Sequence, residues 1–156
     1  MLVNCVAYKN GDKIADVPVE RIAEYLQAND AFVWVAVREP SPAELQQLSA
    51  QFDLHPLAVE DADHGHQRPK IDEYGDSLFV VLHTLELVGG EMVRGEVAIF
   101  VGRNYVLSVR SRAQRGFADV RARFEREPEL LRHGPPYVLY ALMDAVVDRY
   151  FPVLEM

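Results

Sequence analysis

The amino-acid sequence predicts an α/β fold in which a mixed β-sheet is flanked by helices on both faces. Of the 156 residues, 49% are hydrophobic and 26% are charged, which suits one globular domain with a substantial core. The run Leu78-Phe79-Val80-Val81-Leu82 lacks polar alternation, as expected of a strand that is buried on both faces. Apolar residues at helical spacing occur before and after this run, so layers of helix are expected above and below the sheet.

Strands and helices are expected to alternate through the first third of the chain. The predicted strands span 2–8, 13–17 and 32–37. The first two would form a hairpin around Asn10-Gly11-Asp12, and Pro18 is placed to open a helix before the third strand. The buried stripe of this helix is expected to consist of Val19, Ile22, Ala23 and Leu26.

A second helix is predicted from a local start signal. Ser41 and Glu44 form a capping-box pattern, with Pro42 in the first turn. The apolar face of this helix would be formed by Leu45, Leu48 and Phe52. A short third helix is predicted over 54–61, followed by a loop over 65–69.

The second half of the chain is expected to contribute a hairpin and then helices. The hairpin would join 97–101 to 105–109 through the turn 102–104. The stretch 110–132 is predicted to be helical, and its arginines are interleaved with acidic residues. A solvated, salt-bridged helix face is therefore favoured over a phosphate-binding surface.

The last helix is predicted to begin at Pro135-Pro136 and to run to the end of the chain. Its final turn has no Gly or Asn cap and no basic residue, so we expect the full protein to continue past Met156. Two units are therefore expected, a domain over 1–134 and its terminal helix over 135–156.

The overall charge favours cations as partners. Lys and Arg total 16 against 24 for Asp and Glu, giving a formal net charge of −8. An acidic chain has no general attraction to nucleic acid or to an anionic membrane surface. The single cysteine, Cys5, cannot form an internal disulfide, which fits a reducing compartment.

Targeting segments and enzyme motifs are not found in the sequence. The N-terminus lacks the basic flank and apolar block of a signal peptide, and no window reaches the ~18 consecutive apolar residues of a spanning helix. The chain is therefore expected to be soluble. Phosphate-loop, dinucleotide, nucleophile-elbow and metalloprotease motifs are missing, so no enzyme is predicted. A metal-assisted hydrolase built from His55, Asp61 and His64 stays an alternative.

Acidic residues are concentrated in the stretch 53–76, where the only basic residues are Arg68 and Lys70. Carboxylates without thiols suit a hard cation such as Mg²⁺. Adjacent helix positions point about 100° apart, so Glu60 and Asp61 would serve two neighbouring ions, or one ion and its water shell. The alternative is that they are surface acids near a helix end.

Two further groups are candidate metal ligands. Asp144 and Asp148 lie on one face of the last helix, and Asp144 is flanked by apolar residues. Asp144 either meets a cation or a basic group of another subunit, or it is hydrated at the rim of the apolar stripe. His64 and His66 are candidate zinc ligands, with local hydrogen bonding as the alternative.

An ordered set of short segments resembles the N-terminal cytosolic domain of the CorA magnesium and cobalt transporters. The segments are 54–61 (LHPLAVED), 66–70 (HQRPK), 79–82, 99–102, 104–107 and 140–148. The resemblance extends from 32 to 154, and the ordered set is more specific than any single segment.

The resemblance implies an α/β/α sandwich, a homopentamer around a central pore, and regulatory Mg²⁺ between neighbouring cytosolic domains. By position, Glu60, Asp61 and Asp144 match residues that contribute to those metal sites. The chain would lie at the cytoplasmic face of the inner membrane, with its last helix leading toward a stalk. The neighbour's partner acid, the membrane helices and the Gly-Met-Asn pore signature would follow Met156. The implied function is regulation of Mg²⁺ or Co²⁺ transport by weakly bound cations.

Two alternatives remain open. A zinc-transporting branch of the same superfamily has the same cytosolic architecture, and His64 and His66 would suit Zn²⁺. The chain could instead be a free-standing metal-binding regulator with no membrane part. The gene sequence after Met156 would distinguish these possibilities.

Overall fold

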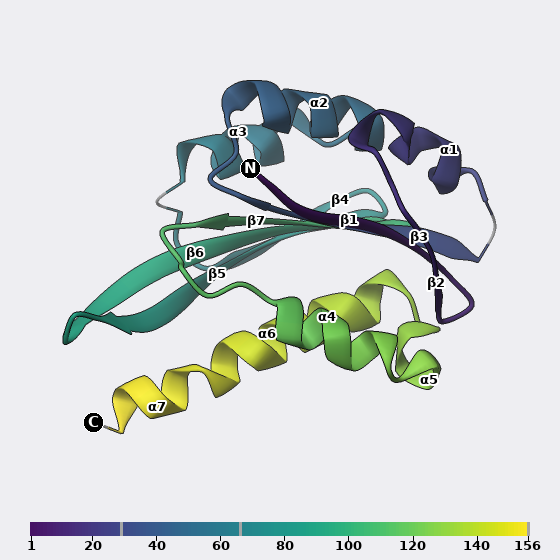
Figure 1. The fold of residues 1–156 in the computed structure, drawn as a ribbon. Coiled ribbons are helices and arrows are strands. Elements are labelled where there is room, and N and C mark those ends of the chain that lie inside the picture. The colour runs from purple at the N-terminus through teal and green to yellow at the C-terminus, as the bar shows by residue number, and fades with distance from the viewer. Residues whose placement is uncertain (29, 66, 156) are drawn as a thin grey trace.

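The computed structural model describes residues 1–28, 30–65 and 67–155 as a three-layered α/β/α sandwich (Figure 1). A mixed sheet forms the middle layer, with strand order β2-β1-β3-β7-β6-β5-β4. The strands are β1 (Leu2–Lys9), β2 (Asp12–Asp16), β3 (Ala31–Arg38), β4 (Lys70–Tyr74), β5 (Ser77–Val88), β6 (Glu91–Val101) and β7 (Tyr105–Ser111).

Helices cover both faces of this sheet, as predicted. One face carries a 3-10 turn, η1 (Val19–Arg21), followed by α1 (Ile22–Leu26), α2 (Pro42–Phe52) and α3 (Pro56–His64). The opposite face carries α4 (Ala118–Glu125), α5 (Pro128–Leu131), α6 (Pro135–Asp148) and α7 (Tyr150–Leu154). The predicted mixed α/β fold is confirmed.

The centre of the sheet is its most buried part. Strands β3 and β7 pair in parallel, whereas the other neighbouring strands pair antiparallel. Six of the eight residues of β3 are buried. This burial explains why the central strands are nearly continuous apolar runs, since each is covered by helices on both sides.

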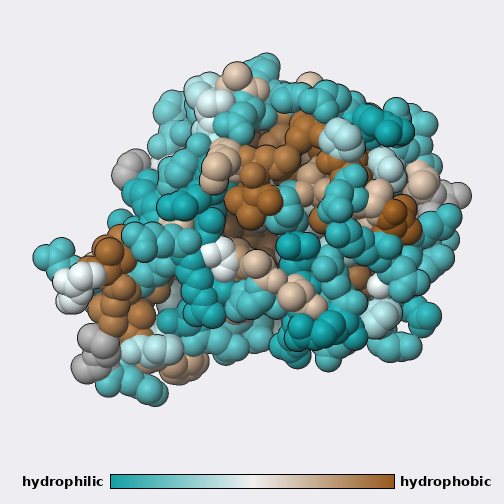
Figure 2. All heavy atoms as spheres, viewed as in Figure 1, coloured by the Kyte–Doolittle hydropathy of each residue, from teal (hydrophilic) through white to brown (hydrophobic). Residues whose placement is uncertain are grey.

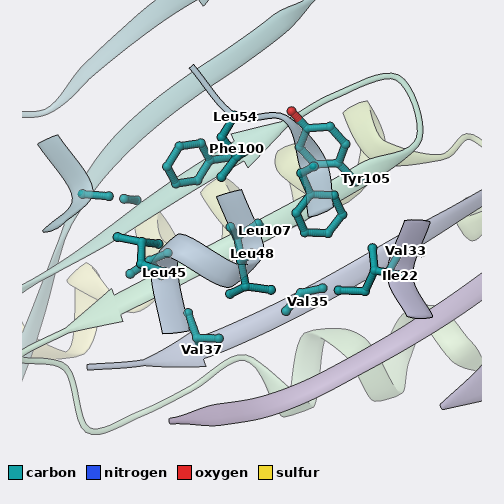
Figure 3. Packing of buried hydrophobic residues seen from close by; sticks show 14 of the residues in the cluster. Ile22, Val33, Val35, Val37, Leu45, Leu48, Leu54, Phe100, Tyr105 and Leu107 are labelled. Atoms are coloured by element: carbon teal, nitrogen blue, oxygen red, sulfur yellow. The ribbon is translucent and has the colours of Figure 1, made fainter. Parts of the chain in front are cut away.

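The sheet separates two hydrophobic cores. Successive side chains of a strand point to opposite faces, so Val33 and Val35 join Leu48 in the core beneath α1–α3 (Figure 3). Phe32 and Trp34 join the core that α4, α5 and α6 cover. Groups anchored to the outer faces of these two helical layers are consequently held far apart by the sheet and both cores.

The predicted start of α2 is confirmed in atomic detail. The Ser41 hydroxyl oxygen accepts a hydrogen bond from the Glu44 N–H at 3.1 Å, and the Glu44 carboxylate accepts one from the Ser41 N–H at 3.0 Å. Pro42 lies in the first turn, where its missing N–H costs nothing. The three apolar residues assigned to the buried face, Leu45, Leu48 and Phe52, are buried.

The prediction of which residues form the buried stripe of α1 was wrong at one position. Ile22 is fully buried, but Ala23 is exposed, and its N–H donates to the Gln51 side chain at 3.0 Å. The first turn is a 3-10 helix, η1, which has three residues per turn and therefore shifts the phase of the stripe.

The sheet is larger than predicted on one side. The strands predicted over 78–82 and 97–101 are longer than expected, and β5 and β6 form a further hairpin with a turn at Gly89-Gly90, where both glycines have positive φ. Strand β4 was not predicted at all. It is an edge strand whose pairing with β5 defines it, because its residues alternate between intermediate and exposed and carry little apolar pattern.

The prediction of one uninterrupted final helix was wrong. Helix α6 ends at Asp148 and α7 begins at Tyr150. Pro152 has no N–H to donate to the Asp148 carbonyl, and its ring crowds that carbonyl, so the helix breaks there. Helix α7 packs against β5, where the Tyr150 hydroxyl donates to the carbonyl of His83.

Exposed apolar side chains gather at the end of the molecule where the β5–β6 hairpin and α7 lie (Figure 2). They are Leu87, Val88, Met92, Phe151 and Leu154. Within residues 1–28, 30–65 and 67–155, no helix combines the length and the apolar character needed to cross a membrane.

Candidate metal-binding site

Helix α3 is positioned by its apolar face and by its N-cap. Ala58 and Ala62 are buried against the sheet, so the opposite side of the helix faces solvent. The Nδ1 atom of His55 accepts a hydrogen bond from the N–H of Leu57 at 3.2 Å, which caps the helix. The His55 ring also stacks on Tyr74 with 4.1 Å between ring centroids, which ties the start of α3 to β4.

The two predicted acidic ligands of α3 have different surroundings. Glu60 is exposed to solvent. Asp61 is turned toward β4, with 28% of its side chain exposed, and its Oδ2 atom lies 2.6 Å from the Nζ atom of Lys70. Neighbouring helix positions point apart, as the sequence interpretation assumed, so the two carboxylates do not chelate one point.

Lys70 bridges two carboxylates from different elements. Its ammonium group lies 2.6 Å from Asp61 of α3 and 3.0 Å from Asp72 of β4. The hydrogen bond to Asp61, and to a smaller extent the one to Asp72, raises the pKa of Lys70 above its ordinary value of 10.5. The ammonium also lies 5.8 Å from the centroid of the Phe79 ring. Sequence reasoning missed this role, although Lys70 is one of only two basic residues in the acidic stretch 53–76.

The third predicted ligand, Asp144, lies on the other side of the sheet. Helix α6 buries Val138, Leu142 and Val146 on its side facing the sheet, which leaves Asp144 exposed. Asp144 lines an open groove of about 520 Å³ between α4 and α6, together with Asp148 and several other side chains. The structure therefore brings Glu60 and Asp61 onto one helix and separates both from Asp144 by the full thickness of the sheet.

The described part of one chain holds no complete metal site. Among residues 1–28, 30–65 and 67–155, no group of three or more His, Cys, Asp or Glu side chains is arranged to hold a metal ion. His55, Asp61 and His64, the three residues considered for a metal-assisted hydrolase, are therefore not arranged around a common point. Oxygen ligands suit Mg²⁺, so the carboxylates of α3 fit the expected ion in kind but supply only part of a coordination shell.

His64, the last residue of α3, is engaged locally. The Nδ1 atom of His64 lies 2.9 Å from the carbonyl oxygen of Glu60, one turn earlier in α3. The prediction that His66 is a zinc ligand concerns a residue outside the described parts of the chain. The local hydrogen bond of His64 agrees with the alternative that sequence reasoning raised for it.

The arginine-rich segment is a salt-bridged surface, as predicted. Pairs four residues apart link Arg115 to Asp119, Arg121 to Glu125 and Arg123 to Glu127, at 3.2, 3.5 and 3.3 Å. The helical prediction for 110–132 was too long, because residues 110 and 111 belong to β7 and α4 begins only at Ala118.

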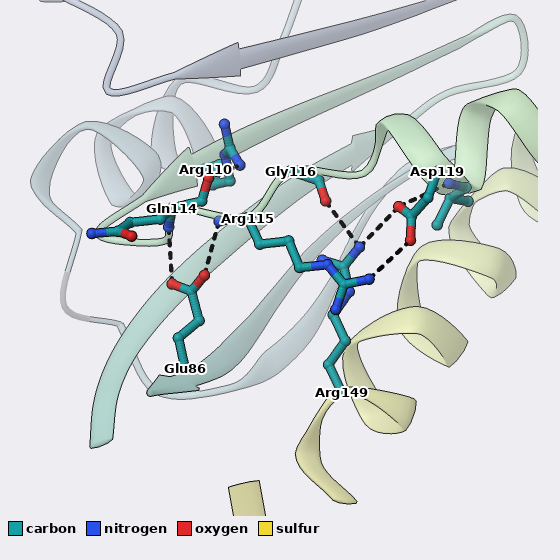
Figure 4. A network of polar contacts seen from close by, with 8 residues as sticks. Glu86, Arg110, Gln114, Arg115, Gly116, Asp119 and Arg149 are labelled. Atoms are coloured by element: carbon teal, nitrogen blue, oxygen red, sulfur yellow. Dashed lines mark hydrogen bonds and ion pairs between the residues drawn. The ribbon is translucent and has the colours of Figure 1, made fainter. Parts of the chain in front are cut away.

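A polar network missed by sequence reasoning anchors the junction of α6 and α7 (Figure 4). Arg149 donates to the Gly116 carbonyl and to Asp119 Oδ1, both at 2.9 Å. Glu86 of β5 accepts hydrogen bonds from the consecutive N–H groups of Gln114 and Arg115, at 2.9 and 2.8 Å. The loop between β7 and α4 is thus fastened to β5 and to the end of α6.

Comparison with known proteins identifies the family of this chain. The sequence model of the family described as CorA-like Mg²⁺ transporter protein matches residues 29–156. YfjQ of Bacillus subtilis (strain 168) is 36% identical over 141 residues, or 90% of this chain. Its name describes it as a metal ion transporter. The cobalt/magnesium transport protein CorA of Thermotoga maritima is 33% identical over 114 residues, or 71% of this chain.

A solved structure agrees in fold. The full-length CmaX protein superimposes over 99% of this chain and 47% of its own length, with a TM-score of 0.78 and 21% sequence identity. The chain spans less than half the length of the two curated relatives, 43% of YfjQ and 32% of the Thermotoga protein. On the family match and the identity to these relatives, the chain belongs to the family of CorA-like Mg²⁺ transporter proteins.

Proposed function

We propose that this chain is the cytosolic, metal-sensing domain of a CorA-type Mg²⁺ or Co²⁺ transporter, and that it regulates transport by binding divalent cations between subunits. The longer protein would be a multi-pass protein of the inner membrane, with this domain at the cytoplasmic face. Family membership supports a role in metal transport. The exposed acidic side of α3 supports a cation-binding role for the domain itself.

The observation that carries the proposal is the placement of the acids on opposite faces. Glu60 and Asp61 lie on the layer formed by α1–α3, whereas Asp144 lies on the layer formed by α4–α7. One chain cannot gather them around one ion. In a head-to-tail ring, unlike faces of neighbouring chains meet, so acids from different copies can complete a site. A homopentamer is the ring that the family resemblance implies.

Such a site would act as a sensor because Mg²⁺ binds the assembled ring more tightly than the separated domains. Acidic faces that meet at a subunit contact repel one another until a divalent ion bridges them, so Mg²⁺ stabilises the assembled, symmetric ring. A site with few direct carboxylates leaves the ion largely hydrated, and its affinity is low. Low affinity is what sensing of an abundant ion requires.

The proposal is tested by limited proteolysis of the longer protein that contains this domain, over a range of Mg²⁺ concentrations. Mg²⁺ should protect the domain, because a bridging ion stabilises only the assembled state. Asp61→Asn and Asp144→Asn should each raise the Mg²⁺ concentration needed for half-protection by about tenfold or more. A tenfold change is equivalent to a loss of about 1.4 kcal/mol in the free energy of Mg²⁺ binding.

His64→Ala is the matched control, since it removes a neighbouring side chain of α3 without removing a carboxylate. It should leave the Mg²⁺ response unchanged. If His64→Ala abolishes protection and the two carboxylate variants do not, the oxygen-ligand sensor is wrong and the zinc-transporting branch becomes the better assignment.

A further inference from the structure

Lys70 occupies the position at which a cation would neutralise two carboxylates. The Oδ2 atoms of Asp61 and Asp72 both lie within 3.0 Å of its Nζ atom. These carboxylates come from different elements, α3 and β4, and would repel one another at this separation without a positive charge between them. The chain therefore already supplies an ion to this acidic pair.

We propose that Lys70 is an internal counter-ion that competes with divalent cations for Asp61 and so sets the affinity of the α3 site. This inference rests on the proposed function, because it assumes that Asp61 contacts the regulatory ion. A divalent ion that binds Asp61 meets the ammonium of Lys70 at the same carboxylate. Either the two cations repel one another, or Lys70 withdraws.

Strand geometry gives Lys70 a place to withdraw. Lys70 and Asp72 are two residues apart on β4, so their side chains lie on the same face of the strand. The backbone of β4 is fixed by pairing with β5, where Lys70 lies opposite Val81 and Asp72 opposite Phe79. When a divalent ion takes Asp61, the ammonium can remain on Asp72 and keep one of its two ionic contacts.

Partial burial makes the competition effective. The side chains of Asp61, Lys70 and Asp72 are 28%, 25% and 35% exposed, so solvent screens their charges less than it screens fully exposed pairs. The exposure is still enough for an ion to reach Asp61 from solvent. Asp61, Lys70 and Asp72 together carry a net charge of −1, and the two carboxylates without Lys70 carry −2.

The test is Mn²⁺ binding to the purified 156-residue chain, followed by the loss of the electron paramagnetic resonance signal of free Mn²⁺. Mn²⁺ is the probe because it accepts the same oxygen ligands as Mg²⁺. Lys70→Met should tighten binding by about tenfold or more, the scale expected when a positive charge a few ångströms from a divalent ion is removed. Lys70→Arg keeps the charge and should bind within about threefold of the unmodified chain.

Two further variants locate the ion and guard against misfolding. The double variant Asp61→Asn with Lys70→Met should lose the gain, because the carboxylate for which Lys70 competes is no longer present. Lys70→Gln removes the same charge with a polar side chain and should reproduce the effect of Lys70→Met. Circular dichroism spectra of each variant should match that of the unmodified chain.

The outcomes separate the two proposals. If Asp61→Asn weakens Mn²⁺ binding but neither Lys70→Met nor Lys70→Gln strengthens it, the counter-ion inference is wrong and the metal-sensing function stands. If the double variant keeps the full gain, the ion sits on Asp72 and the inference is also wrong. If no variant binds Mn²⁺ at about 10 mM, above the roughly 10⁻⁴–10⁻³ M range of weak oxygen-ligand sites, the counter-ion inference is wrong. The metal-sensing function is then decided by the proteolysis of the longer protein, in which neighbouring subunits are present.

Discussion

Cys5 lies on β1 with only 6% of its surface exposed, where it packs as a small apolar side chain. Burial, and to a smaller extent the charge of Asp16, raises the pKa of the Cys5 thiol from 9.0 to about 11. Because the thiolate is the nucleophile, Cys5 should be inert in the folded protein. A structural thiol of this kind needs no disulfide or metal partner.

We predict that iodoacetamide alkylates Cys5 at pH 8 at least about tenfold more slowly in the native protein than in urea, measured by mass spectrometry. The raised pKa also favours the neutral thiol in the folded state. Its contribution to stability is therefore present below the unfolded pKa and is lost as the pH rises toward about 11. Equal alkylation rates in native and unfolded protein would contradict the buried placement of Cys5.

At the scale of single residues, the sequence singled out candidate ligands by their acidity but did not predict which side chains they contact. Glu60 and Asp61 stood out because they lie in the acidic stretch 53–76. The pairing of Asp61 with Lys70 depends on the approach of α3 to β4, and β4 has no apolar pattern from which to predict it. Lys70 could have been singled out only as a cation among many acids.

Helix α2 shows what local signals can do at the scale of an element. Its start was predictable because the capping box is formed entirely by residues within one turn, Ser41 and Glu44. The break between α6 and α7 also has a local cause, Pro152, and was predictable in the same way. Strand β4 was not, because an edge strand is defined by its partner rather than by its own residues.

The capping box provides a test of element stability. Ser41→Ala should lower the free energy of unfolding by about 1 kcal/mol, because the Glu44 N–H in the first turn of α2 loses its hydrogen-bond acceptor. Ser41→Asp preserves an acceptor and should restore most of the loss. Urea unfolding followed by circular dichroism measures both values. A Ser41→Ala protein as stable as the original would show that the cap does not contribute.

The junction of α6 and α7 predicts a dependence of stability on pH. Partial burial by itself raises the pKa of Asp119, but Arg149 lowers it, and the net pKa lies below the ordinary value of 3.8. A depressed carboxyl pKa stabilises the folded state above the unfolded pKa, and this stabilisation is lost as the pH falls through the folded value.

We therefore expect the free energy of unfolding to fall more steeply from pH 5 to about pH 3 in the original protein than in an Asp119→Asn variant. Urea titrations at a series of pH values measure the difference. Parallel pH profiles for the two proteins would mean that the ion pair of Asp119 with Arg149 does not contribute.

At the scale of the whole molecule, the sheet decides what the acids can do together. The apolar run in β5 predicted a sheet covered on both faces, and that prediction was confirmed. Which helix covers which face was not predictable, because it depends on how the strands are ordered in space. For this reason the separation of Asp61 from Asp144 became clear only from the structure.

We propose that one chain carries two separate, incomplete cation sites, around Asp61 on α3 and around Asp144 on α6. A Mg²⁺ titration of the ¹⁵N-labelled chain, followed through its amide chemical shifts, tests this claim most directly. The amides of α3 and α6 should shift independently, with dissociation constants of roughly 10⁻⁴–10⁻³ M or weaker. Asp144→Asn should remove only the shifts in α6. A single high-affinity transition, or the loss of both sets of shifts in Asp144→Asn, would contradict the claim.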